Sequence, residues 1–326
     1  MSGSEAESDD TGKLAVVRVS GRGKKMAHSR AEFEATVADI EAQVRATNDK
    51  INARSGRNLF MAFAVGIGLG LLLLVSLIFI KELFMLFAGF LIAFTAFELS
   101  SALRVAGRDV PRIPILIVAI ATVPASFYFL STGHWFATLG GIVFVALWRI
   151  AETAFPSKRS SLRDVGRDIL AGTFVVAYVI FLAGFAVVLT ARDGGQWWTL
   201  AFLIVVISID TGAYASGLTF GKHPMAPSIS PKKTWEGFAG SVAAALISGM
   251  LLAIFMLQQP WWVGVILGLT LVVTATVGDL SESLVKRDLG IKDISTWLPG
   301  HGGLLDRLDS ILPSAAAAFG LYLMFA

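Results

Sequence analysis

Long apolar runs alternate with short polar segments through most of the chain, after a polar start that ends near Asn58. A helix needs about 20 residues to cross a bilayer, and backbone groups within lipid must satisfy one another's hydrogen bonds. The pattern therefore predicts an all-α polytopic membrane protein. We place nine spans, roughly at residues 59–80, 83–103, 113–131, 135–154, 168–191, 197–218, 236–257, 262–280 and 308–325.

The polar start itself has two parts. Residues 1–28 carry acidic and then basic residues without an apolar period, which predicts a disordered polar tail. Within residues 29–58, apolar residues from Phe33 to Ile51 fall on one helical stripe after a Ser29 and Glu32 capping box, which predicts a cytoplasmic amphipathic helix. The rest divides into N-terminal membrane helices at 59–196 and a C-terminal membrane region at 197–326, where the charged segments lie.

Lysine and arginine are unevenly shared between the two sides of these spans. With the N-terminus inside, the inner loops between the spans hold 15 of these residues and the outer loops 2, Lys81 and Arg192. The positive-inside rule therefore predicts a cytoplasmic N-terminus and an external C-terminus. Tryptophans then begin three of the spans at the outer face, as an interfacial belt would: Trp135, Trp197, Trp198, Trp261 and Trp262. The longest polar loops, 219–235 and 281–307, would face the cytoplasm.

Composition narrows the chemistry. The chain is 55% hydrophobic and 16% charged, with a formal net charge of +3 and no cysteine. Disulfide chemistry, thiol chemistry and cysteine-type zinc sites are excluded. No phosphate loop of the Walker type, dinucleotide fingerprint or Ser/His/Asp arrangement is visible. We expect no nucleic-acid partner.

The segment from Ser283 to Ser310 is the most charge-dense stretch of the C-terminal half. It surrounds the run Pro299-Gly300-His301-Gly302-Gly303 with carboxylates and cations, and Asp306 and Asp309 follow at a predicted helix start. Glycines let a backbone approach a ligand and expose N–H groups to phosphate. This segment therefore predicts phosphate and metal chemistry.

Just before it, Asp279, Glu282 and Lys286 recur at helical spacing on one face. Oxygen ligands beside a phosphate substrate suit Mg²⁺, and we favour Asp279 and Asp306 as its ligands with Asp309 as a third. The alternative is that these acids only pair with Lys286, Arg287 and Arg307. Glu98 and Glu152 lie at the inner ends of their spans, and we interpret both as supporting or snorkelling acids rather than metal ligands.

A second polar stretch runs from Ile209 to Gly237. Asp210 is expected about 10 Å inside the cytoplasmic end of its helix, where a carboxylate is costly and is a functional candidate by default. Its alternative is a packing carboxylate tied to a buried cation. The hydroxyls and ammonium groups of Ser230, Lys232, Lys233 and Thr234 suit triphosphate oxygens, although a lysine pair can also be a simple positive-inside anchor.

Both stretches resemble the phosphatidate cytidylyltransferases, also called CDP-diacylglycerol synthases. That family's signature is a Ser, then Lys-Arg, Lys-Asp, Pro-x-His-Gly-Gly and Asp-Arg-x-Asp. Here its places are filled by Ser283, Lys286, Arg287, Lys292, Asp293, Pro299, His301, Gly302, Gly303, Asp306, Arg307 and Asp309. Asp210–Tyr214, Phe220–Lys222 and Ser230–Gly237 resemble its second block, so the resemblance covers about 100 residues.

The resemblance implies that CTP and phosphatidate give CDP-diacylglycerol and pyrophosphate, in phospholipid biosynthesis, at the cytoplasmic face of the cell (plasma or inner) membrane. It implies Mg²⁺, and leaves open a second, monovalent cation and a homodimer. The implied catalytic residues are Asp279, Lys286, Arg287, Asp306 and Asp309. The implied substrate-binding residues are Asp210, Ser230, Lys232, Lys233, Thr234, Ser283, Lys292, His301, Gly302, Gly303 and Arg307.

Two other functions remain open at this stage. A CTP-dependent lipid-alcohol kinase would cleave at the γ-phosphate and would need a general base for a hydroxyl. An anion transporter would fit the intramembrane Asp210. Its polar groups would be expected at the membrane midplane, whereas those of this chain cluster toward one face.

Overall fold

The computed structural model describes residues 59–155, 160–291, 294–295 and 303–326. The chain divides into two compact units, residues 1–64 and 65–326, and the fold described here is that of the second unit. The predicted tail and amphipathic helix at 1–58, together with Lys292, His301 and Gly302, lie outside the described residues.

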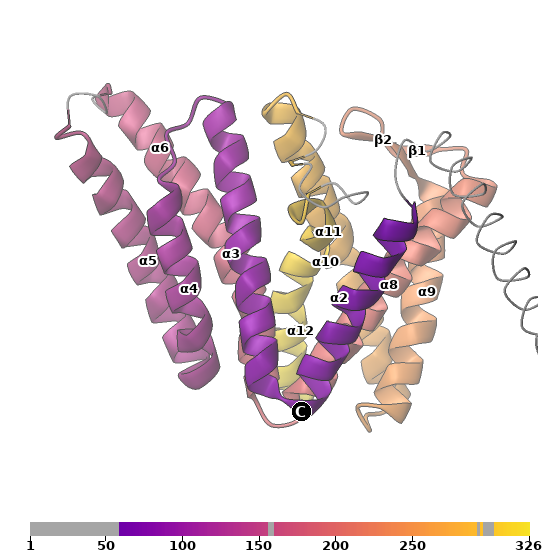
Figure 1. Cartoon of the computed structure of the whole chain (residues 1–326). Coiled ribbons are helices and arrows are strands. Elements are labelled where there is room, and N and C mark those ends of the chain that lie inside the picture. Colours follow the sequence, from indigo (N-terminus) through magenta and orange to yellow (C-terminus); the bar gives the residue numbers. More distant parts are fainter. Residues whose placement is uncertain (1–58, 156–159, 292–293, 296–302) are drawn as a thin grey trace, which may run out of the picture. The chain divides into compact units, whose positions relative to one another are not determined.

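Helices form nearly all of the described chain, as the apolar pattern predicts. Two short strands, which the sequence did not predict, form a hairpin between α8 and α9 (Figure 1). In chain order the elements are α2 (Leu59–Phe79), α3 (Lys81–Val105), α4 (Arg112–Tyr128), α5 (Leu130–Glu152), α6 (Leu162–Val175), η2 (Val176–Phe181), α7 (Leu182–Ala191), α8 (Gly195–Phe220), β1 (Pro224–Ala226), β2 (Ser230–Thr234), α9 (Trp235–Phe255), α10 (Trp261–Asp288), α11 (Leu305–Leu308) and α12 (Ile311–Phe325).

Seven helical segments of the described chain are long and apolar enough to cross a membrane. Two further apolar stretches, Gly66–Phe79 and Arg112–Tyr128, are shorter. Each of the nine predicted stretches is therefore helical, while the number of spans stays a prediction. Large apolar side chains such as Phe136, Leu147 and Val273 are exposed on the outward faces, which is the arrangement that lipid stabilises. The chain is an integral membrane protein.

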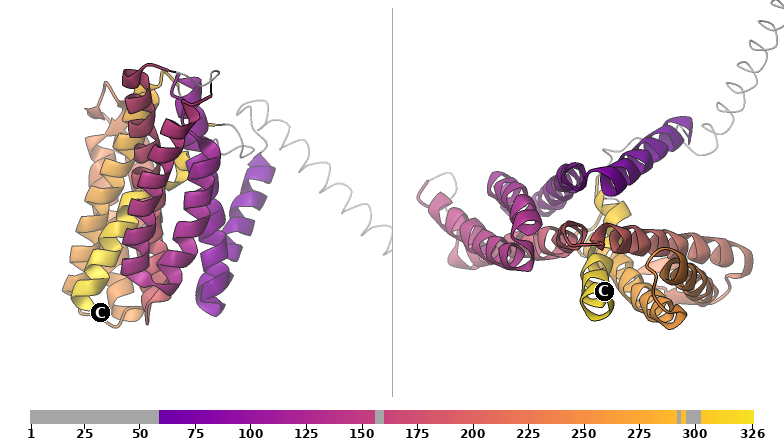
Figure 2. Two further views of the ribbon diagram at one scale, coloured as in Figure 1. Left: turned by 90° about the vertical axis from the view of Figure 1, so that its left-hand side faces the viewer. Right: turned by 90° about the horizontal axis from the view of Figure 1, so that it is seen from below.

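The helices of this unit form two groups joined through one long helix. Consecutive helices of the first group, α3 to α6, pack together, and so do α8, α9 and α10 in the second (Figure 1). Helix α6 continues through η2, a π-helical turn, into α7, which contacts α4 and α8 and packs along α12. Figure 2 shows the two groups from below. Each group has its own buried apolar cluster, with Leu99 in the first and Phe202 in the second.

Small residues allow the second group to pack closely. A Cβ added at Gly212 would lie 2.7 Å from Ala244 Cβ and 2.8 Å from the Gly240 carbonyl oxygen, so α8 and α9 meet almost backbone to backbone there. Membrane helices commonly use small residues in this way. Gly212 is therefore explained by helix packing without a ligand.

The polar loop expected before α9 is partly a strand. Strand β2 pairs antiparallel with β1 through Pro224 with Thr234 and Ala226 with Ser230. The Thr234 hydroxyl accepts a hydrogen bond from Gly237 N at 3.1 Å and caps α9. The hairpin thus ends where the helix begins, and it fixes the two lysines of β2 beside the helix ends.

Candidate active site

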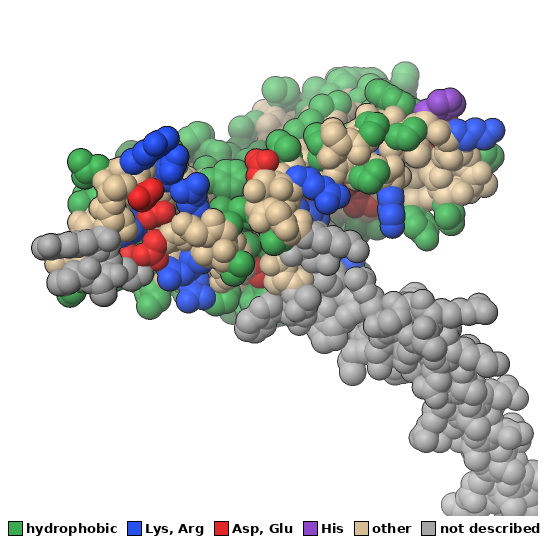
Figure 3. Space-filling view, turned by 90° about the horizontal axis from the view of Figure 1, so that it is seen from above, with side chains coloured by type: hydrophobic (Ala, Val, Ile, Leu, Met, Phe, Trp, Pro, Cys, Tyr) green, Lys and Arg blue, Asp and Glu red, His purple; other side chains and the backbone are tan. Residues whose placement is uncertain are grey.

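Charged side chains gather at one end of the helical unit (Figure 3). This end carries the C-terminus of α3, the hairpin and the end of α10, whereas the chain's C-terminus lies at the opposite end (Figure 1). The arrangement agrees with the uneven distribution of Lys and Arg along the sequence.

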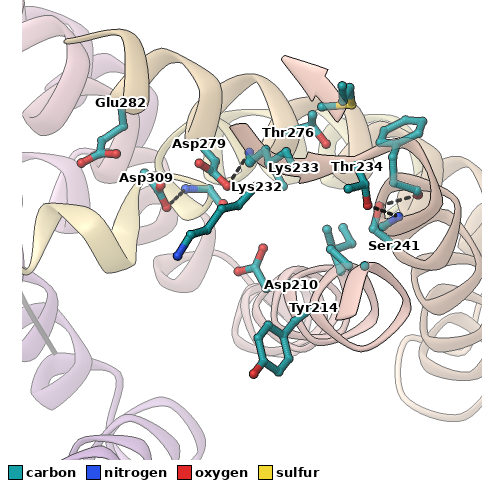
Figure 4. A pocket seen from close by; sticks show the side chains of 18 of the residues that line it. Asp210, Tyr214, Lys232, Lys233, Thr234, Ser241, Thr276, Asp279, Glu282 and Asp309 are labelled. Atoms are coloured by element: carbon teal, nitrogen blue, oxygen red, sulfur yellow. Dashed lines mark hydrogen bonds and ion pairs between the residues drawn. The ribbon is translucent and has the colours of Figure 1, made fainter. Parts of the chain in front are cut away.

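A cavity of about 450 Å³ opens between α8, the hairpin, α9, α10 and the start of the last helix. Nine of the predicted site residues line it: Asp210, Lys232, Lys233, Thr234, Asp279, Lys286, Asp306, Arg307 and Asp309. Segments up to 100 residues apart in the sequence therefore meet at one place, as the two-block resemblance implies. Figure 4 shows this cavity from close by.

Asp210 lies on α8 and faces the cavity (Figure 4). It is ten residues before the end of the helix at Phe220, so it lies about 15 Å from that end at 1.5 Å per residue. The expected depth of about 10 Å was too small because α8 continues past the predicted span. Figure 4 shows the Lys232 side chain reaching into the space between Asp210 and Asp309.

Asp279, on α10, is paired with a lysine of the hairpin. Lys233 Nζ lies 2.5 Å from Asp279 Oδ2, and both side chains are partly exposed to the cavity. Ser283 Oγ, one turn along, donates to Asp279 Oδ1 at 3.5 Å. The sequence left open that Asp279 pairs with Lys286, Arg287 or Arg307, whereas its partner here is Lys233. Lys233 lies 46 residues before Asp279, so helical spacing could not relate the two.

A second ion-pair group connects α10 to α11. Lys286 Nζ lies 2.6 Å from Glu282 Oε2 and 3.1 Å from Asp306 Oδ1. Asp306 Oδ2 accepts from Gly303 N at 2.9 Å. Both oxygens of Asp306 therefore already have donors, and the pairing of this acid with Lys286, which the sequence left open as the alternative to a metal ligand, is present.

Asp309 reaches the same cavity from the bend between α11 and α12. Its Oδ1 accepts from Ser310 N at 2.6 Å. A glycine at 278 allows this approach, because a Cβ there would overlap the Asp309 carbonyl oxygen and lie 2.8 Å from Pro313 Cγ. Gly278 precedes Asp279 directly, so this close contact sets Asp309 beside Asp279.

The remaining predicted residues of the described chain do not line the cavity. Ser230 begins β2, and Arg287 Nε donates to the Ile229 carbonyl oxygen at 3.3 Å, which holds the hairpin to α10. Ser283 and Gly303 are connected to the cavity through their hydrogen bonds to Asp279 and Asp306, which line it. Their substrate and catalytic roles stay predictions.

Two acids outside the predicted set of site residues take part in the contacts of the site. Glu282 is 1% exposed and lines the cavity beside Lys286. Glu98 is 2% exposed and binds backbone N–H groups at the start of α11, so of the two interpretations left open its contacts agree with a supporting acid and not with a snorkelling one. Helical spacing pointed to Glu282, but nothing in the sequence links Glu98 to a segment more than 190 residues away.

The residues present fit a magnesium ion that enters with its substrate. The described residues contain no group of three or more Asp, Glu or His side chains that could hold a metal by themselves. Mg²⁺ usually needs only one or two carboxylates, and phosphates and waters complete its shell. Asp279 and Asp309 provide carboxylate oxygens at one cavity wall, where Lys233 pairs with Asp279, and Lys232 reaches into the cavity from β2 (Figure 4).

Comparison with known proteins identifies the family. The sequence profile of the cytidylyltransferase family matches residues 61–325. The chain is 40% identical over 277 residues to the phosphatidate cytidylyltransferase of Mycobacterium bovis, covering 82% of this chain and 89% of that one. It is 37% identical over 295 residues to that of Mycobacterium leprae, covering 88% and 94%. To the enzyme of the same name from Brucella suis it is 40% identical over 152 residues, or 45% and 56% of the two chains. The chain belongs to the cytidylyltransferase family.

Proposed function

We propose that this protein transfers the cytidylyl group of CTP to phosphatidate, giving CDP-diacylglycerol and pyrophosphate. The observation that carries the proposal is the cavity in which four aspartates and three lysines from separated elements meet. Nucleotidyl transfer to a phosphate needs this combination, since a negatively charged phosphate must approach a triphosphate. The relatives of similar length carry the name of this activity.

The described residues suit charge neutralisation better than proton abstraction. Phosphatidate is a phosphomonoester with a second pKa of about 6, as phosphorylated side chains have, so its oxygen is already largely an anion at neutral pH. That oxygen attacks the α-phosphorus of CTP, the bond to the bridging oxygen breaks, and pyrophosphate leaves. Lys232, Lys233 and Arg307 line the cavity and offset the charge of the phosphates.

Mg²⁺ would add Lewis-acid stabilisation of the phosphoryl oxygens when it is bound. Asp309 is a better candidate than Asp306 to hold it beside Asp279, because both oxygens of Asp306 already accept from Lys286 and Gly303. Asp279 would exchange its ion pair with Lys233 for the metal. We assign Asp306 chiefly to the orientation of Lys286. This refines the ligand set expected from the sequence, in which Asp306 came before Asp309.

We place the active site at the cytoplasmic face, with nine spans and the C-terminus outside. The support is the distribution of lysine and arginine, and the gathering of charged side chains at the end of the unit that holds the cavity (Figure 3). The nucleotide then enters from the aqueous side, and the lipid phosphate comes from the adjoining leaflet.

The test is release of pyrophosphate by purified protein in detergent. Release should require both CTP and phosphatidate and should fall sharply when ATP replaces CTP. Asp279→Asn should lose the activity, while Asp193→Asn, at the exposed turn between α7 and α8, should keep it. Pyrophosphate release that does not depend on phosphatidate would contradict the proposal.

A further inference from the structure

Glu98 is a buried carboxylate that binds the far end of the chain. It lies on α3, and its Oε2 accepts from Leu304 N at 2.8 Å and from Leu305 N at 3.0 Å. Its Oε1 accepts from the Ser295 hydroxyl. One side chain of the first helix group therefore takes three hydrogen bonds from the segment between α10 and α12.

These donors lie on both sides of the stretch 296–302. Ser295 precedes it and Leu304 follows it, and the two ends are close together, because a Cβ added at Gly303 would lie 3.2 Å from Ser295 N. Gly303 in turn donates to Asp306, which pairs with Lys286. The contacts form a continuous path from Glu98 to two residues that line the cavity.

Packing alone would seat α11 on α3 without a charge. Ile294 and Leu305 belong to the same buried apolar cluster as Leu99, the neighbour of Glu98. Burying a carboxylate is costly unless it is fully hydrogen-bonded, so an apolar residue at this position would give a simpler core. However, an apolar residue at position 98 would leave the Leu304 and Leu305 N–H groups buried without their acceptor. Apolar packing holds α11 against α3, and the hydrogen bonds to the Glu98 carboxylate fix the position at which α11 begins.

We propose that Glu98 is a positioning residue for cytidylyl transfer: it clamps both ends of the segment that leads into α11 and so sets Asp306 and Lys286 at the cavity. Glu98 itself does not line the cavity. The role rests on the proposed function of the site. It also assigns a task to the first helix group, which contributes no other carboxylate to the contacts around Asp306 among the described residues.

Two measurements on Glu98→Ala test the clamp and its catalytic effect separately. Hydrogen exchange of the full-length protein in detergent should speed up at the Leu304 and Leu305 amides and stay unchanged in α4. In the same protein, kcat should fall by about tenfold or more, while KM for CTP changes by less than about threefold, since the lysines of β2 do not depend on Glu98. Glu152→Ala is the matched control, because Glu152 is the corresponding membrane-edge acid of α5, and within the described chain its carboxylate bonds to its helix neighbours Trp148 and Arg149.

Glu98→Gln keeps one acceptor oxygen and guards against a variant that fails to fold. It should restore slow exchange at the two amides and bring kcat to within about fivefold of the unchanged protein. Unchanged exchange in Glu98→Ala would overturn the clamp. Faster exchange with unaltered kcat, or a Gln variant with slow exchange but the low kcat of the Ala variant, would overturn the positioning role. If the unchanged protein made no CDP-diacylglycerol, the proposed function would fail while the exchange result still decided the clamp.

Discussion

Replacing Gly278 by alanine tests whether the contact between α10 and α12 sets the distance between two site carboxylates. The added Cβ would overlap the Asp309 carbonyl oxygen and lie 2.8 Å from Pro313 Cγ. Both obstacles belong to the start of the last helix, and one is backbone, which cannot rotate away. The start of α12 must therefore move away from α10, and Asp309 moves with it.

The magnitude follows from the cost of overpacking a close contact, about 1–3 kcal/mol for one extra methyl group. The higher helix propensity of alanine relative to glycine offsets about 0.5–1 kcal/mol of this overpacking cost. If the displacement of Asp309 carries the strain into the reaction, each 1.36 kcal/mol lost from transition-state stabilisation lowers the rate about tenfold. We expect a fall in kcat of about eightfold at the middle of these ranges, and of at most about seventyfold.

The assay is incorporation of α-labelled CTP into lipid by purified protein, with unfolding followed by tryptophan fluorescence. Gly320→Ala is the matched control, since it makes the same change on α12 where no heavy atom lies within 4 Å of the new Cβ. It should retain activity within about twofold. Equal activity of the two variants would show that Asp309 does not need its present distance from Asp279, and would refute the reasoning.

Three further predictions concern charge and topology. Asp279→Asn and Asp306→Asn should each abolish activity while leaving the protein folded and inserted, because one loses a metal ligand and the other loses the charge that pairs with Lys286; a normal Mg²⁺ dependence in Asp279→Asn, or full activity in Asp306→Asn, would contradict the assignment. Lys232→Ala should raise the KM for CTP more than it lowers kcat, as expected for a contact equal in the ground and transition states, and the reverse pattern would speak against a binding role. Since the chain lacks cysteine, single cysteines at Ser131 and Gln258 should react with an impermeant thiol reagent on intact cells and one at Ser157 should not; labelling at Ser157 would overturn the topology.

The helices could be predicted from the sequence because hydrophobic length alone decides them in a bilayer. Their ends were less predictable. Helix α10 continues to Asp288, eight residues past the predicted span, since its polar last turns are stabilised by the pairing of Lys286 with Glu282 and Asp306. The β1–β2 hairpin gives no alternating apolar pattern, and its geometry depends on pairing with a neighbour.

The site residues could be named from motif spacing, but their partners could not. Lys233 and Asp279 are joined by the approach of a hairpin to a helix, which no local pattern encodes. Glu98 was more hidden still, because its donors are backbone N–H groups, which every residue but proline has. A buried carboxylate in an apolar span was the only signal of it, and that signal suited snorkelling equally well.

The fate of each CTP phosphorus tests the central claim most directly. Purified protein would be given phosphatidate with CTP labelled at the α-phosphorus or, separately, at the γ-phosphorus. Attack on the α-phosphorus predicts that the α-label enters the lipid and that the γ-label leaves in pyrophosphate. Recovery of the γ-label in the lipid would contradict cytidylyl transfer and would make the protein a lipid kinase.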